Sequence, residues 1–329
     1  MNKSRLTTAA VLGLGFLALF GLVGAKSQDA AGKQVELSVF AAASMTETLT
    51  QIGQQYSQVR PDVAIVFTFD SSGALKTQIQ EGADCDIFIS AAQKQMDQLD
   101  LSAGAKKNPQ GLDLIDRDSR FNLVENKVVL AVPEGNPADI RCYEDLGTEK
   151  VKTVCIGNED VPVGVYSEEI LRDLGIFDSL KARGIITYGS NVKEVTTQIK
   201  EASVDCGIIY GTDARAAGLL IVDTAKGQCS PVVYPAAMVT RSRKKEEAQA
   251  FLDYLVGGEA RAVFEAAGFS MVECTLGISL APAFVADFPS YAHKFNQRTF
   301  HVRLINLCTS DKKIISQNQA QRDSESTLE

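Results

Sequence analysis

The 329-residue sequence contains no tryptophan and only two histidines, His293 and His301. A serine nucleophile needs a positioned base, and both histidines lie in the C-terminal tail described below. No Gly-x-Ser-x-Gly motif surrounds Ser44 or Ser72, the serines that follow predicted strands. The sequence therefore predicts that the protein is not an enzyme.

Positive charge is also scarce. The chain has 33 Lys and Arg against 41 Asp and Glu, a formal net charge of −8. A nucleic-acid-binding protein is expected to present a basic face, and the basic cluster at residues 241–245 is short enough to be the solvated start of a helix. We therefore expect an acidic globular protein with no nucleic-acid partner.

A long apolar run occurs at the N-terminus. Lys3 and Arg5 precede the apolar residues 6–23, and Val23-Gly24-Ala25 provides compact residues for cleavage. This order is typical of a signal peptide, residues 1–25, cleaved near Ala25 in an exported protein. An uncleaved membrane anchor is the alternative, since the run is at the lower limit of length for spanning a bilayer. No cysteine lies near the predicted cut, so a lipid anchor is not expected.

The rest of the chain alternates between short strands and amphipathic helices. Strands are predicted at residues 35–40, 62–69, 85–90, 127–132, 151–156, 185–188, 206–210 and 231–239. Such alternation implies mostly parallel sheets flanked by helices. Because the segment at 85–89 is echoed at 206–210, we predict two lobes of one type with a ligand cleft between them. Lobe 1 is expected at 34–122 plus 233–269, and lobe 2 at 123–232.

Four strand-to-helix junctions contain small residues or helix-capping patterns. Ser44 with Glu47 and Asn191 with Glu194 have the capping-box spacing. The other two junctions are Ser71-Ser72 and Val161-Pro162-Val163. Helix N-termini present free N–H groups and a partial positive charge, so each of them suits an anion.

Any one of these junctions could be an ordinary cap, but four in a two-lobed exported protein indicate an anion site in the cleft. No arginine lies at the junctions, and Lys76 and Lys193 are expected to face solvent. The site would therefore hold its anion with neutral donors, and such a site suits an anion that must later be released.

The chain at this point resembles the periplasmic molybdate-binding proteins of ABC transporters. The matching stretches are Phe40–Ser44, Ser71–Leu75, Ala83–Asp97, Val161–Gly164, Asn191–Val192 and Gly207–Tyr210, within about residues 35–269. The resemblance implies a two-lobed periplasmic-binding-protein-like α/β fold and capture of molybdate or tungstate. It also implies periplasmic localisation, delivery to an ABC permease at the inner membrane, a monomer, and no cofactor.

The same resemblance implies which groups hold the oxyanion, with its molybdenum bound only through the oxygens. They are the hydroxyls of Ser44 and Ser72 in lobe 1, and the N–H groups of Val163 and Val192 with the hydroxyl of Tyr210 in lobe 2. Tyr210 comes from the resemblance alone, whereas the junctions also point to the other four residues.

One departure from the family is Asp70, where a small or amide residue is more usual. Its carboxylate would repel a dianion, or would accept a proton from a protonated oxyanion such as phosphate. A binding protein of the same fold for sulfate, phosphate or an iron complex therefore remains an alternative, as does a regulatory sensor. Iron would need clustered ligands, and Tyr166, Tyr188 and Tyr210 are interpreted instead as core or cleft residues.

The second departure is the C-terminal tail, residues 270–329, which extends past the usual end of the family. We interpret it as a poorly ordered read-through or frame-altered end, with a partner-binding tail as the alternative. Among the cysteines, Cys142 and Cys155 are a candidate disulfide, whereas Cys85 and Cys206 are expected to be buried strand residues.

Overall fold

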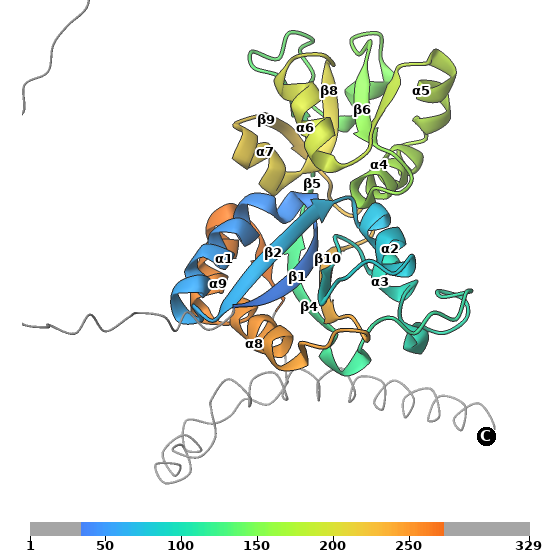
Figure 1. The fold of residues 1–329 in the computed structure, drawn as a ribbon. Coiled ribbons are helices and arrows are strands. Elements are labelled where there is room, and N and C mark those ends of the chain that lie inside the picture. Colours follow the sequence, from blue (N-terminus) through green and yellow to red (C-terminus); the bar gives the residue numbers. More distant parts are fainter. Residues whose placement is uncertain (1–33, 273–329) are drawn as a thin grey trace, which may run out of the picture. The chain divides into compact units, whose positions relative to one another are not determined.

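The computed structural model describes residues 34–272. The predicted signal peptide and the tail beyond residue 272 lie outside the described residues. Within this part of the chain, two helix-flanked β-sheets form the fold, as expected for a two-lobed α/β protein (Figure 1). We call the part of the chain built on the first sheet lobe 1 and the part built on the second sheet lobe 2.

The sheet of lobe 1 has six strands in the order β11-β4-β10-β3-β1-β2. The strands are β1 (Val35–Ala42), β2 (Val63–Asp70), β3 (Ile87–Ile89), β4 (Phe121–Asn126), β10 (Val232–Met238) and β11 (Ser270–Met271). The helices of this lobe are α1 (Thr46–Val59), α2 (Ser72–Gln80), α3 (Gln93–Asp97), α8 (Lys245–Leu255) and α9 (Gly258–Ala267).

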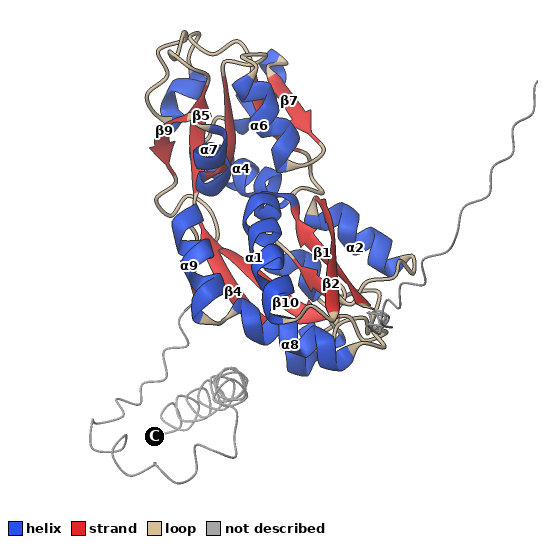
Figure 2. Ribbon diagram, turned by 60° about the vertical axis from the view of Figure 1, so that its left-hand side comes forward, coloured by secondary structure: helices blue, strands red, loops and turns tan. Residues whose placement is uncertain are grey.

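The sheet of lobe 2 has five strands in the order β7-β6-β8-β5-β9. The strands are β5 (Val128–Val132), β6 (Val154–Gly157), β7 (Ile186–Gly189), β8 (Cys206–Tyr210) and β9 (Leu220–Thr224). The helices of this lobe are α4 (Pro162–Asp173), α5 (Phe177–Arg183), α6 (Val192–Lys200) and α7 (Gly211–Ala217). Figure 2 shows the helices of both lobes packed around their sheets.

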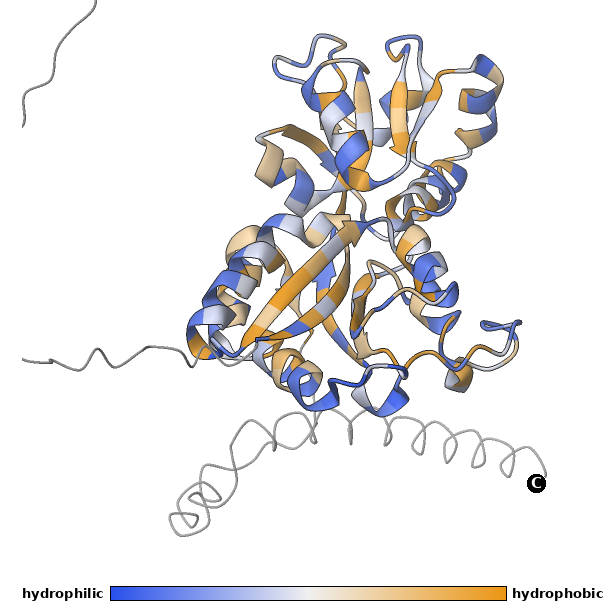
Figure 3. Ribbon diagram, in the orientation of Figure 1, coloured by the Kyte–Doolittle hydropathy of each residue, from blue (hydrophilic) through white to orange (hydrophobic). Residues whose placement is uncertain are grey.

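Side-chain alternation along β1 explains why lobe 1 has helices on both faces of its sheet. Leu37 and Val39 point into a core that includes Leu49 of α1 and Phe251 of α8. Phe40 points to the other face, into a core formed with residues of α2 and α3. Because successive strand residues face opposite sides, both faces of the strand are apolar and both must be covered. The hydropathy colouring shows these apolar strands between helices that mix polar and apolar residues (Figure 3).

Both sheets are mixed rather than mostly parallel. β1 pairs parallel to β2 and β3, and β6 pairs parallel to β7 and β8. The strands next to the two crossings between lobes run antiparallel to their neighbours, as β10 does to β3 and β4 and as β5 does to β8 and β9. The β–α–β pattern was thus sufficient to predict the parallel strands, but not the orientation of strands that follow a crossing.

The chain crosses from lobe 1 to lobe 2 between Asn126 and Val128, and it returns between Thr224 and Val232. The predicted start of lobe 2, residue 123, falls inside β4, a strand of the first sheet. Two adjacent crossings of this kind are suited to act as a hinge.

The described cysteines are free thiols, which corrects the candidate pairing of Cys142 with Cys155. Cys155 is buried in β6 while Cys142 is half-buried. Cys85 and Cys206 are buried, as expected, and burial raises the pKa of both thiols. Among residues 34–272, no helix is long and apolar enough to span a membrane.

Candidate functional site

The four predicted junctions come together because their strands are parallel neighbours. At the ends of β1 and β2, Ala42 lies opposite Asp70. At the ends of β6 and β7, Gly157 lies opposite Gly189. The carboxyl ends of parallel strands meet at one edge of a sheet. Each lobe therefore brings two of the junctions together at one edge of its own sheet.

A small cavity lies where these two edges face each other. It is lined by Ala42, Ala43, Ser44, Asp70, Ser71, Ser72, Ala91, Val161, Pro162, Val163, Val192 and Tyr210. All five residues predicted to hold the oxyanion are among them. None of the lining residues carries a positive charge, so a bound anion would be held by hydroxyl and N–H donors.

Ser44 does not cap a helix, contrary to the capping-box interpretation. It lies in a short 3-10 turn, Ala43–Met45, and α1 begins only at Thr46 without a side-chain cap. The Ser44 hydroxyl instead lies 2.9 Å from the hydroxyl of Tyr234, in buried surroundings. Asn126 Nδ2 donates to the same phenol oxygen at 3.3 Å. Either hydroxyl of this pair can be the donor. When the Tyr234 phenol donates to Ser44 Oγ, the Ser44 hydrogen is free to point to a ligand.

At the second junction the two serines have different roles. Ser71 is the N-cap of α2, and its Oγ accepts from the Ala74 N–H at 3.1 Å. Ser72, which is completely buried, accepts from the Ala91 N–H at 2.9 Å. This bond occupies a lone pair of the Ser72 oxygen but leaves its hydrogen available as a donor.

In lobe 2 the cavity receives main-chain groups. Val163 is in the first turn of α4, after Pro162, and Val192 is the first residue of α6. The first N–H groups of a helix have no acceptor within that helix, so both are available to a ligand. Asn191 caps α6 by accepting from the Glu194 N–H at 3.1 Å, as its spacing predicted.

Tyr210 ends β8, and its ring is 1% exposed. Its hydroxyl has no hydrogen-bond partner among the described residues. Burial raises the pKa of Tyr210 well above 10, with the nearby phenols and Asp213 adding to the effect, so the hydroxyl stays protonated and can donate. A buried donor without a partner costs about 1–3 kcal/mol, and a ligand in the cavity would recover that cost.

Two charged residues lie beside the cavity. The Asp70 carboxylate lines it and accepts from the Ser71 N–H at 2.7 Å, with Asn191 Nδ2 3.5 Å away. The sequence suggested that Lys193 faces solvent, but the structure shows its ammonium group bound by two carboxylates. Its Nζ lies 2.7 Å from Glu47 and 2.9 Å from Asp213, and its side chain is only 30% exposed.

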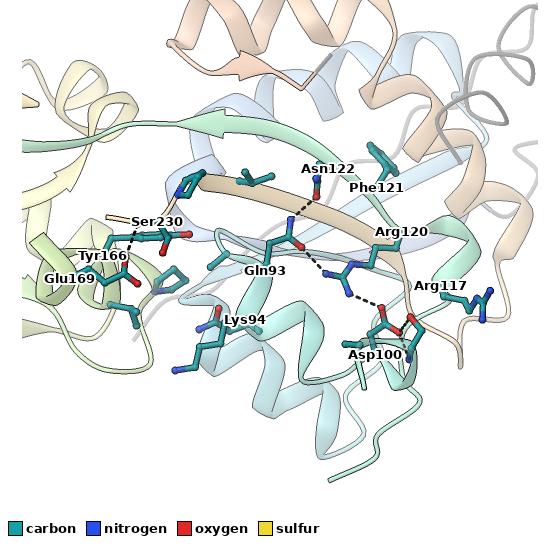
Figure 4. Close-up of a pocket in the computed structure, with 18 residues that line it drawn as sticks. Gln93, Lys94, Asp100, Arg117, Arg120, Phe121, Asn122, Tyr166, Glu169 and Ser230 are labelled. Carbon is teal, nitrogen blue, oxygen red and sulfur yellow. Dashed lines mark hydrogen bonds and ion pairs between the residues drawn. The ribbon is translucent and has the colours of Figure 1, made fainter. Parts of the chain in front are cut away.

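A larger cavity of about 830 Å³ shares Pro162 with the small one (Figure 4). Its residues come from both lobes, including Gln93, Asn122 and Tyr166. Arg120 points into this region, but Asp97 and Asp100 hold its guanidinium at 2.5 and 2.6 Å. Lys94 and Arg117 also line this cavity, but none of the five residues predicted to hold the oxyanion is among its lining residues. The small cavity is therefore the candidate oxyanion site.

Of the tyrosines set aside as iron ligands, Tyr166 is buried beside Tyr210, whereas Tyr188 is 49% exposed on β7. Residues 34–272 contain no cluster of three or more His, Cys, Asp or Glu side chains that could hold a metal ion.

Sequence reasoning missed Tyr234 and Asn126, the residues behind Ser44. Tyr234 lies in β10 and Asn126 is the last residue of β4, both strands of lobe 1. Neither residue belongs to a local sequence motif. Only the pairing of β10 with β4 brings them together, and that pairing joins segments far apart in the chain.

Two helix-flanked sheets with a donor-lined cavity between their edges define a solute-binding protein of the two-lobed type. Residues 37–270 match the family model described as bacterial extracellular solute-binding protein. The chain belongs to this family, whose members bind solutes rather than catalyse reactions. This agrees with the sequence prediction that it is not an enzyme.

Individual relatives are similar over most of this chain. A Bacillus subtilis lipoprotein assigned to ABC transporter substrate binding, YvgL, is 35% identical over 78% of this chain and 94% of its own length. The molybdate-binding protein ModA of Haemophilus influenzae is 33% identical, over 71% of this chain and 90% of that one. The solved periplasmic molybdate-binding protein of Azotobacter vinelandii is 26% identical, with a TM-score of 0.63, over 72% of this chain and all of that one.

Proposed function

We propose that the protein captures molybdate outside the cytoplasm and delivers it to an ABC permease in the inner membrane. The observation that carries this proposal is the small cavity, where two serine hydroxyls, two helix starts and the Tyr210 hydroxyl meet from both lobes. Among the described residues, that hydroxyl has no hydrogen-bond partner. The likeness to molybdate-binding relatives supports the choice of anion. Tungstate has nearly the same shape and charge and would bind in the same way.

In this proposal, Ser44, Ser72 and Tyr210 donate O–H bonds, while Val163 and Val192 donate N–H bonds. A hydrogen bond to a charged acceptor is worth about 1.5–3 kcal/mol net. At the upper end of that range five such bonds supply about 15 kcal/mol, and an association cost of about 7 kcal/mol then leaves about 8 kcal/mol, which corresponds to a dissociation constant of about a micromolar. Molybdenum would be held only through its oxygens, so no metal-ligating side chain is required.

Capture would occur by closure of the two lobes about the crossings at residues 126–128 and 224–232. Neutral donors make release feasible, because no buried counter-charge has to be left unpaired when the anion departs. The accompanying expectations are a leader cleaved near Ala25, a periplasmic location, a monomer and no resident cofactor.

Asp70 gives a second candidate function, binding of a protonated oxyanion such as phosphate. A carboxylate that lines the cavity can accept a hydrogen bond from such an anion but repels a full dianion. Thermal unfolding of the mature protein with about 1 mM molybdate, tungstate, sulfate or phosphate separates the two functions. At 100 times the dissociation constant, a ligand stabilises the folded state by about 2.7 kcal/mol. We expect molybdate and tungstate to raise the melting temperature, and stabilisation by phosphate alone would favour the second candidate.

A further inference from the structure

Gly73 makes a direct contact between the lobes beside the cavity. Its N–H, in the first turn of α2, donates to the carbonyl oxygen of Asp160 in lobe 2 at 3.2 Å. A Cβ added at position 73 would lie 2.2 Å from that oxygen and 2.9 Å from the Asp160 Cβ. These separations are shorter than van der Waals contact, so no larger residue fits at position 73 while the lobes are together.

The helix itself does not require glycine at position 73. Gly73 is not among the described residues with a left-handed backbone, and alanine is a better helix former. The loop opposite is held in place, since Asn158 accepts from the N–H groups of Asp160 and Val161, each at 3.0 Å. The close approach of the lobes is therefore the reason why this position needs a glycine.

A second contact joins the lobes on the side of Ser44 and Val192. Lys193 Nζ lies 2.9 and 2.7 Å from the two carboxylate oxygens of Glu47, which belongs to α1 of lobe 1. The buried Asp213 carboxylate, in lobe 2, holds the same ammonium at 2.9 Å. Asp213 thus fixes Lys193 within its own lobe and leaves it directed at Glu47 across the interface.

We propose that these two contacts form a latch that sets the affinity for the anion, although neither Gly73 nor Glu47 donates a hydrogen bond to it. The proposal rests on the proposed capture of an oxyanion by lobe closure. A favourable contact that exists only in the closed state stabilises that state relative to the open state. It therefore raises the apparent affinity of a ligand that binds the closed state. Gly73 permits full closure, and the Glu47–Lys193 pair stabilises it.

Gly73→Ala tests the steric half of the latch. We expect the ligand-free variant to melt at the same temperature as wild type or higher, because alanine favours the helix and the open lobes have room for it. Molybdate affinity should fall about tenfold to a hundredfold, the range expected for an overpacked contact. Small-angle scattering should show compaction of wild type, but not of the variant, on addition of molybdate. Gly258→Ala, in the first turn of α9 with no atom near its added Cβ, is the matched control.

Glu47→Gln tests the electrostatic half, and it leaves the Lys193–Asp213 pair intact. Glu47 is 58% exposed in its side chain, so the expected loss of affinity is small, about twofold to fivefold. The loss should shrink in 0.5 M NaCl, because salt screens an exposed pair. Glu246→Gln, also in the first turn of a helix and exposed, serves as the control and should bind like wild type.

The outcomes distinguish the latch from the function on which it rests. If wild type binds none of the four oxyanions, the proposed capture fails and the latch fails with it. If wild type binds tightly and Gly73→Ala binds equally well, or compacts equally on binding, the capture stands and the latch is overturned. A Gly73→Ala variant that melts lower without ligand would also overturn the proposal, because position 73 would then matter to the fold rather than to closure.

Discussion

The hydroxyl oxygens of Ser44 and Tyr234 lie 2.9 Å apart in the core of lobe 1, although 190 residues separate them in the chain. Tyr234 is fully buried on β10, and burial raises its pKa, so it remains a phenol rather than a phenolate. This bond orients a hydroxyl that lines the cavity. Tyr234 is therefore a positioning residue for the proposed anion contact of Ser44.

A double-mutant cycle measures that relationship. Ser44→Ala should weaken molybdate binding by about 1–3 kcal/mol, or roughly fivefold to over a hundredfold, through one lost hydrogen bond to a charged acceptor. Tyr234→Phe alone should cost about 1 kcal/mol. In the Ser44→Ala background the second change should cost much less, because the residue it positions is gone. Additive losses by calorimetry would show that Tyr234 acts independently of Ser44, and Ser57→Ala on the surface of α1 is a control.

Tyr210→Phe should move affinity and stability in opposite directions. The variant removes a buried hydroxyl that has no partner among the described residues, so ligand-free stability should be unchanged or up to about 1 kcal/mol higher. Binding of molybdate should weaken about tenfold with the loss of one donor. Chemical denaturation and calorimetry measure the two quantities. Tyr188→Phe, at an exposed position, should change neither. Unchanged affinity in Tyr210→Phe would remove this tyrosine from the site.

Asp70→Asn should strengthen binding of a dianion. The carboxylate lines the cavity, and its replacement by a neutral amide keeps an acceptor for the Ser71 N–H while removing a negative charge. We expect molybdate affinity to rise by roughly 1 kcal/mol, about fivefold, at low salt. Asp84→Asn, at an exposed position of the same lobe, should have no effect. If the Asp70 variant binds phosphate more weakly and molybdate no better, Asp70 serves as a proton acceptor and the second candidate function is favoured.

The stability of the folded protein should depend on the titration of Asp213. Burial raises the pKa of its carboxyl from 3.8 to about 6, although Lys193 opposes the shift. The folded state therefore binds this proton more tightly than the unfolded state. The stability contributed by the group is fully present below about pH 4 and is lost as the pH rises through about 6.

We therefore expect the free energy of unfolding of wild type, relative to Asp213→Asn, to decrease between about pH 4 and pH 6 and to level off above that. Urea denaturation of both proteins across this range measures the difference. Asp113→Asn, at an exposed site, controls for the general effect of removing a carboxylate. A difference that does not vary with pH would contradict the assigned titration.

Local sequence patterns were enough to predict where α2, α4 and α6 begin, since each of these junctions is formed within a few residues. Asn191 shows this most clearly, because its N-cap bond to the Glu194 N–H follows directly from their spacing. Ser44 shows the limit of such patterns, because a 3-10 turn comes between it and α1 and gives its hydroxyl a different partner.

The remaining features depend on contacts between distant segments. Tyr234 reaches Ser44 only because β10 enters the first sheet between β3 and β4. Lys193 was expected to face solvent because its position in α6 does not reveal its partners. These partners, Glu47 and Asp213, lie on two other helices. The antiparallel strands and the close approach of the lobes at Gly73 likewise depend on how the chain crosses between lobes. The spacing of residues within a short segment does not predict these crossings.

The most direct test of the central claim is a calorimetric titration of the mature wild-type protein, freed of bound anion, with molybdate, tungstate, sulfate and phosphate. We expect one molybdate to bind per chain with a dissociation constant of about a micromolar or tighter, tungstate to bind similarly, and the other two anions to bind much more weakly. Tight binding of sulfate or phosphate with no binding of molybdate would contradict it.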